Sequence, residues 1–421
     1  MTGAEPIENK TEQMPSPNRG VSRWPRPLLH VMDFFSSLRL TVVFLGLSVL
    51  LVFIGTLAQV DEGLYEAQNR YFRSLFIYWG PHGASWKIPV FPGGYLIGGV
   101  LLVNLLAAHA RRFKFSRKKI GIFIIHAGIV LMLVGQFATD LLSRETQMQM
   151  FEGESKSYSE DSRETEFVLI DTSDAKADRT YSIPESKLAR HPEIKDSRLP
   201  FVVRVKSYWP NASIFEEPPI KANIPPGSLK PAPTDGTLSQ HFVLPEPVVK
   251  DMDRRNVPAA VVELVGDKGP VASFLVYAGV FTRQSFMANG KSYDVALRFA
   301  RYYNPFKVTL LKATHENYKG TDLPKNFASV VRLENPKQNE ARETKIYMNN
   351  PLRYEGLTFF QYQMAADEMA VQRMGRASST LQVVRNPSWL TPYLSCVLVG
   401  VGLTVQFMSH LIGFLMKRRN A

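Results

Sequence analysis

The chain has 421 residues, with 50 Lys or Arg against 38 Asp or Glu, a formal net charge of +12 and a single cysteine. One cysteine excludes an intramolecular disulfide framework and a cysteine-rich zinc or iron–sulfur site. The length indicates more than one folding unit. A basic excess commonly indicates nucleic acid or an anionic membrane as a partner, but the chain contains no nucleic-acid-binding motif.

In chain order, a polar tail is followed by three apolar stretches, a long polar segment and a last apolar stretch. A membrane-crossing helix needs about 20 apolar residues, and each stretch reaches that length with almost no charge. A buried helix of a soluble core is the alternative for each stretch. We predict a mobile cytosolic tail over 1–37, which does not resemble a cleaved signal peptide. The other segments are transmembrane helices over about 38–60, 91–110 and 120–142, an extracytoplasmic domain over 143–388, a fourth transmembrane helix over 389–416 and a cytosolic tail over 417–421.

The basic excess lies next to the apolar stretches. Residues 111–119 hold six basic and no acidic side chains, residues 417–419 hold three, and residues 1–39 add a net +1, so these segments carry +10 of the +12. Because basic loops stay in the cytoplasm, we expect both termini there and the large domain on the far side of the lipid bilayer.

Within the third stretch, Gly121, Gly128 and Gly135 recur every seven residues. Small residues at such spacing let two helices approach closely. We expect this helix to pack within a bundle.

The long polar segment contains short runs that alternate between apolar and polar residues, which is typical of half-buried antiparallel strands. Residues 210–250 carry nine prolines, which indicates a long loop or an extended covering segment, and leaves one or two β subdomains open. No catalytic triad, phosphate loop or metal-spaced carboxylate cluster occurs, so this domain is interpreted as a binding or scaffolding body. The predicted fold is therefore an α-helical membrane protein with four transmembrane helices plus a large β-rich extracytoplasmic domain between helices three and four. The alternating runs that predict its strands are residues 201–209, 259–265, 273–280, 307–313, 328–333, 344–349, 357–363 and 380–385.

The ionisable residue His126 lies inside the third stretch, about 10 Å from its cytoplasmic edge at roughly 1.5 Å per residue. Intramembrane ionisable residues usually mark function, and an imidazole in an apolar cleft lined by Phe123 and Val130 is a suitable axial ligand for haem iron. The alternative is a histidine hydrogen-bonded to a neighbouring helix. His410 has a matching depth in the fourth stretch, so a His126–His410 clamp is conceivable, although His410 can also snorkel to the edge. His109, at the end of the second stretch, is interpreted as an interfacial residue.

Several motifs together resemble the ResB family, the CcsB-type subunit of System II cytochrome c biogenesis. The resemblance covers the whole chain in the expected order. The motifs are Ser37-Leu38-Arg39-Leu40-Thr41 with Ile54-Gly55-Thr56-Leu57, His126-Ala127-Gly128, the segment Tyr318–Phe327, the run from Asn350 to Gln361 (NPLRYEGLTFFQ), and Val383-Val384-Arg385-Asn386-Pro387.

This resemblance implies a subunit that joins a CcsA-type membrane partner in the bacterial cytoplasmic (inner) membrane. The complex passes haem b across the membrane and attaches it to the CxxCH motif of apocytochrome c. It further implies that His126 is the haem ligand on this subunit's side and that the opposing ligand belongs to the partner. Because the chain ends soon after the fourth stretch, we expect an unfused subunit, either non-catalytic by itself or half of a two-subunit haem ligase. The alternative is a cofactor-free, membrane-anchored scaffold or chaperone.

Overall fold

The computed structural model describes most of the chain, and the first 25 residues of the predicted N-terminal tail lie outside the described part. So do most of the basic loop before residue 119 and residues 319–323 of the Tyr318–Phe327 motif. The described residues are 26–81, 86–112, 116, 119–174, 177–216, 224–231, 234–249, 255–279, 283–318, 324–366, 371–372 and 374–419.

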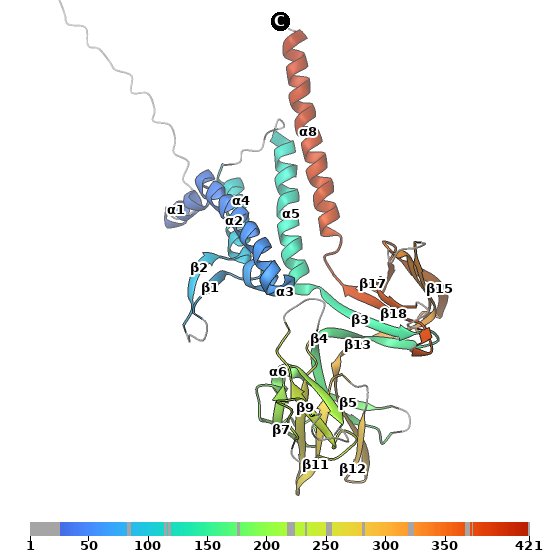
Figure 1. The fold of residues 1–421 in the computed structure, drawn as a ribbon. Coiled ribbons are helices and arrows are strands. Elements are labelled where there is room, and N and C mark those ends of the chain that lie inside the picture. The colour runs from blue at the N-terminus through green and yellow to red at the C-terminus, as the bar shows by residue number, and fades with distance from the viewer. Residues whose placement is uncertain are drawn as a thin grey trace, which may run out of the picture.

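The long helices gather on one side of the molecule and the strands of the β-domain on the other, while the small pair β1–β2 lies with the helices (Figure 1). Four helices in the described part of the chain, α2, α4, α5 and α8, are long and apolar enough to cross a membrane. The predicted combination of four apolar helices and a large β-rich domain is thereby confirmed. The helical elements are α1 (Arg26–Phe35), α2 (Leu38–Glu62), α3 (Leu64–Ala67), the π-helix η1 (Gln68–Phe72), α4 (Gly94–Arg112), α5 (Ile120–Leu142), α6 (Glu185–Leu188) and α8 (Thr391–Arg419).

Helix α1 lies within the segment expected to be a mobile tail. The buried amide of Asn104, on α4, donates hydrogen bonds to the backbone carbonyl oxygens of Phe35 and Ser37. Its oxygen accepts a bond from Thr41 Oγ1 at 2.7 Å. One polar side chain on α4 therefore fixes the junction between α1 and α2.

The repeating glycines of α5 are buried and face α8, as the close-packing prediction requires. A Cβ on Gly121 would lie 2.7 Å from the carbonyl oxygen of Gly402, and one on Gly128 would lie 3.0 Å from that of Ser395. Because the contacts run in opposite order along the two helices, α5 and α8 are antiparallel, and they lie side by side in Figure 1.

The β-domain between α5 and α8 is built on an antiparallel ten-stranded sheet. Its order is β15-β14-β13-β4-β3-β18-β17-β16, with β12 paired to β13 and β5 to β4. A four-stranded sheet, β11-β10-β7-β6, and two small pairs, β1-β2 and β8-β9, complete the strands of the described chain. The bounds are β1 (Phe76–Trp79), β2 (Ile88–Pro92), β3 (Arg144–Phe151), β4 (Ser155–Asp171), β5 (Arg179–Pro184), β6 (Glu193–Ile194), β7 (Val202–Trp209), β8 (Ala212–Glu216), β9 (His241–Pro245), β10 (Ala259–Gly266), β11 (Gly269–Tyr277), β12 (Gln284–Ala288), β13 (Lys291–Asn317), β14 (Pro324–Asn335), β15 (Glu340–Tyr347), β16 (Leu352–Tyr354), β17 (Leu357–Ala365) and β18 (Ser378–Arg385).

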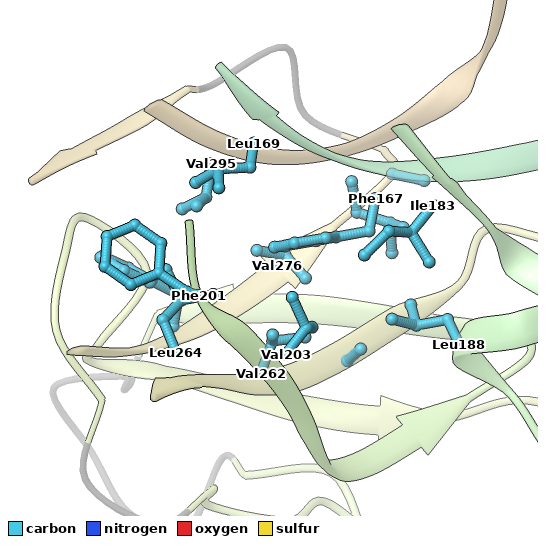
Figure 2. Close-up of a cluster of buried hydrophobic side chains, with 14 of the residues drawn as sticks. Phe167, Leu169, Ile183, Leu188, Phe201, Val203, Val262, Leu264, Val276 and Val295 are labelled. Atoms are coloured by element: carbon cyan, nitrogen blue, oxygen red, sulfur yellow. The ribbon is translucent and has the colours of Figure 1, made fainter. Parts of the chain in front are cut away.

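Two separate hydrophobic cores divide this domain into two lobes, which answers the question that the sequence left open. In the first lobe, the four-stranded sheet packs on β4, β5 and β13 around residues such as Phe167, Val262 and Val276 (Figure 2). The second core, around Met148 and Phe359, lies among β3, β13, β14, β17 and β18. Strand β13 contributes to both cores, so the lobes are joined through a continuous strand.

All eight predicted strand runs lie within or largely within observed strands. Described residues of the proline-rich segment 210–250 form a cover, one of its two predicted alternatives: Leu238 and Val243 pack on the face of β10 and β11 away from the first core. Strands β8 and β9 were not predicted within it.

Candidate functional site

His126 lies on α5 with its side chain half-buried. Phe123 and Val130, three residues before and four after it, share its face of the helix because a turn takes 3.6 residues. Phe123 is 44% exposed. The two predicted cleft residues therefore flank the imidazole and present apolar surface around it.

The hydrogen-bond partner of His126 is His109, on α4. The Nδ1 atom of His126 lies 3.0 Å from Nε2 of His109, and the rings meet edge to face with centroids 4.6 Å apart. The His109 ring also lies near that of Phe123, at a centroid distance of 6.4 Å. The interpretation of His109 as only an interfacial residue missed this contact.

A second contact of His109 determines the direction of the bond between the rings. Its Nδ1 atom lies 2.9 Å from the backbone carbonyl oxygen of Leu105. A carbonyl oxygen can only accept, so His109 Nδ1 carries the proton and, in a neutral ring, Nε2 carries a lone pair. His126 Nδ1–H must then donate to His109, which leaves the lone pair of His126 on Nε2. Among the described residues, that nitrogen has no hydrogen-bond partner.

This arrangement fits metal ligation. A ligating histidine typically binds through one ring nitrogen while the other donates to a neighbouring acceptor that fixes tautomer and orientation. The Leu105–His109–His126 chain supplies that acceptor. The face of His126 can thus present a neutral, oriented Nε2 between two apolar side chains.

A polar contact at the other end of the same helix pair holds α4 and α5 in register. Tyr95, on α4, donates a hydrogen bond to Asp140, on α5, and Asp140 also forms an ion pair with Arg73 at 2.8 Å. Tyr95 and His109 are 14 residues apart, as are His126 and Asp140, or about 21 Å along each helix. The two contacts therefore match an antiparallel pair, and sequence reasoning had not assigned Asp140 a role.

The structure does not bring His410 to His126. His410 lies on the exposed side of α8, with its Nε2 atom 2.7 Å from Nε2 of Gln406. Ile125 packs against Gly402, so His126 is level with that part of α8. His410 is eight residues further on, about 12 Å along the helix axis. An in-chain clamp on one iron does not follow from this arrangement.

Comparison with known proteins places part of the β-domain in a recognised family. Residues 269–378, from β11 to the start of β18, match the sequence model of the ResB-like family. The resemblance to the ResB family is confirmed. The ResB-like segment contains the NPLRYEGLTFFQ run, in which Glu355 and Gly356 both have positive φ and form the two-residue turn between β16 and β17.

A curated relative extends the similarity of this chain to known proteins beyond that segment. Protein NrfI of Wolinella succinogenes is 24% identical over 305 residues, which are 72% of this chain and 29% of NrfI. The chain thus spans less than a third of the length of that relative.

Proposed function

We propose that this chain is a membrane subunit of a cytochrome c biogenesis system, and that it handles haem as a substrate. The ResB-like match and the similarity to NrfI support the role in cytochrome c biogenesis. Four apolar helices support a membrane location. The subunit would help pass haem b across the membrane and support its attachment to CxxCH motifs of apocytochrome c, either as a non-catalytic part or as half of a haem ligase.

The observation that carries this proposal is the oriented imidazole of His126. Haem iron takes a neutral imidazole nitrogen as an axial ligand, and His126 Nε2 is left available by the bond from Nδ1 to His109. Phe123 and Val130 would line the macrocycle on the α5 side. His410 is too far along α8 to supply the second ligand, so we assign that ligand to a CcsA-type membrane partner.

The β-domain would position the apocytochrome or brace the partner. In the described chain no group of three His, Cys, Asp or Glu side chains could hold a metal ion. Thioether formation requires ferrous haem, two thiols and close positioning, and positioning alone can supply a large part of such a barrier. A binding body of this size suits that task. We further propose the bacterial cytoplasmic membrane as the location, with both termini in the cytoplasm, from the basic segments that flank the spans.

The test is to purify the chain together with its CcsA-type partner and record reduced-minus-oxidised absorbance spectra. We expect haem in the unaltered complex and loss of most of it in His126→Ala. His410→Ala is the matched control, because it removes a histidine from α8 that has no contact with His126, and it should retain haem. A complex without haem, or haem indifferent to His126→Ala, would favour the cofactor-free scaffold or chaperone instead.

A further inference from the structure

A second site lies where the β-domain meets the helices. A cavity of about 260 Å³ is lined by the beginning of β3, the end of β18, the middle of β13 and the β16–β17 turn. Two arginines from different strands line it, Arg144 at the start of β3 and Arg385 at the end of β18, and they are direct cross-strand partners in the β3–β18 register. Their side chains therefore share one face of the sheet.

The charge in this cavity is unbalanced. Like charges directly opposite each other destabilise a strand pair, and neither arginine has an ion pair with a carboxylate among the described residues. The Arg144 guanidinium stacks over the ring of Tyr302 at 3.7 Å, which holds it in place. Glu355 is the carboxylate that lines the cavity, and it already accepts a hydrogen bond from Gln338.

One residue that lines the cavity also has an unused hydrogen-bond donor. The side-chain amide nitrogen of Asn304 is buried and has no hydrogen-bond partner in the part of the chain that the structure describes. Asn304 lines the same cavity as the two arginines. Buried donors are normally satisfied, so the amide and the two guanidiniums together point to an anionic ligand.

The site lies at the ends of two helices that we place in the membrane. Arg144 follows the end of α5 by two residues. Ser388 Oγ lies 2.8 Å from Thr139 Oγ1, in the last turn of α5, and Asn386 also contacts Thr139. Arg385 is thus next in sequence to Asn386, which touches the end of α5.

An exposed aromatic residue lies at the same helix ends. Trp389, two residues before α8, is 46% exposed, and the Arg353 guanidinium stacks over its ring at 4.5 Å. Exposed tryptophan at the end of a membrane helix is typical of the headgroup region. Arg353 adds a third positive charge near this boundary.

Two of the family-like motifs meet in this cavity although the haem site does not use them. Glu355, Gly356 and Leu357 come from the NPLRYEGLTFFQ run, and Val383 and Arg385 come from the VVRNP motif. The positive φ of Glu355 and Gly356 turns the chain back tightly, which brings the hairpin to the arginines.

We propose that this cavity binds the phosphate of an anionic phospholipid headgroup from the outer leaflet. Guanidinium groups match phosphate oxygens in a bidentate geometry, and the position at the helix ends selects a lipid over an anion from bulk solvent. The inference goes beyond haem handling, but it rests on the membrane placement proposed above.

The test measures phospholipid binding by the full-length chain purified in detergent. Short-chain phosphatidylglycerol is titrated into the protein, and native mass spectrometry counts the bound molecules. Arg144→Gln/Arg385→Gln should weaken the tightest lipid site by about tenfold or more, because charge-assisted bonds are lost. The control, Arg190→Gln/Arg376→Gln, removes the same charge at two exposed arginines that do not line the cavity, and should bind as the unaltered protein does.

Equal lipid binding in the two double variants overturns the proposal. The proposal is also overturned if the site binds inorganic phosphate and phosphatidylglycerol does not displace that phosphate. If the chain is not a membrane protein at all, it will extract without detergent, which separates failure of the membrane placement from failure of this site.

A second measurement needs no variant and covers the case in which the double variant does not fold. Hydrogen–deuterium exchange is compared in bilayer discs of phosphatidylcholine alone and of phosphatidylcholine and phosphatidylglycerol in equal parts. We expect slower exchange in 144–159 and 302–306 with phosphatidylglycerol. If exchange in these segments is the same in the two kinds of disc, the proposal is contradicted.

Discussion

At the scale of single residues, His109 controls what His126 can do. A histidine without a fixed acceptor populates both neutral tautomers, and only one of them offers a lone pair on Nε2. The Leu105 carbonyl oxygen orients His109, and His109 in turn orients His126. His109 is therefore a positioning residue for the proposed ligand and need not touch the iron.

We expect His109→Ala to weaken haem retention by about 10–100-fold, the usual effect of removing the partner of a ligating histidine. His109→Gln should restore much of it, because the Gln amide oxygen can accept from His126 Nδ1–H. The measurement is haem occupancy and the position of the reduced absorbance bands of the purified complex. A purely packing role for His109 would give equal losses in both variants.

Residue counting from the charged flanks predicted that His126 lies about two turns inside its helix, but it did not predict the contact with His109. Helix α4 continues through two arginines to Arg112, so His109 lies three residues, or about 5 Å, inside its end. His126 lies six residues, or about 9 Å, inside α5. The difference is less than one turn, which two facing imidazoles span. Treating Arg111 as the edge of the span placed His109 at the surface and concealed the pair.

At the scale of elements, two opposite faces of α5 contact two different helices. At 100° per residue, His126 lies about 160° around the helix from Gly128, so the histidine points away from the glycine face that packs on α8. The glycine face packs against α8, the helix that follows the β-domain, and the histidine face contacts α4. Packing on one side therefore sets the position of the ligand on the other.

Substitution of a glycine in this face should test how closely α5 packs on α8. Gly128→Leu places a side chain against the Ser395 carbonyl and the Val399 side chain, and overpacking of this kind typically costs about 1–3 kcal/mol. Gly400→Leu on α8 is the control, because a Cβ there meets nothing within 4 Å. Thermal unfolding in detergent, followed by tryptophan fluorescence, should show a lower Tm for Gly128→Leu alone. Equal Tm values would argue against a close α5–α8 seam.

Strand β4 shows why sequence patterning missed some of the strands. Strand β4 begins with the polar run SKSYSEDSRETE before the apolar FVLI, so the first 12 of its 17 residues lack the alternation that marks a strand. This polar part pairs with β13, where Arg301 forms a 2.9 Å ion pair with Glu160. Tertiary pairing, which no local pattern reports, makes this segment a strand. The four long helices were predictable because length and apolarity are local properties.

At the scale of the whole molecule, few residues of the four long helices are fully buried by protein. In the most apolar stretch of each of the four long helices, only 6–17% of the residues are buried within the chain. Exposed apolar area of this extent indicates lipid or another membrane protein as its cover. The exposed side of Phe123 beside His126 is where a CcsA-type partner would complete a haem cleft.

Orientation provides the decisive test at this scale, because access of His126 to cytoplasmic haem depends on it. Cys396, the only cysteine, is first replaced by Ser. Ser197→Cys then adds an exposed thiol between β6 and β7 in the β-domain, and Ser116→Cys adds one in the basic loop between α4 and α5. The two variants differ only in which side of the membrane each thiol is predicted to occupy.

In spheroplasts, a membrane-impermeant maleimide should label Ser197→Cys at once and Ser116→Cys only after permeabilisation. The positive-inside rule gives this expectation, since the loop around residue 116 carries six basic side chains. The reverse labelling pattern would place the β-domain in the cytoplasm. His126, six residues into α5 from that loop, would then open toward the wrong side for haem made in the cytoplasm, and the proposed direction of haem transfer would fail with it.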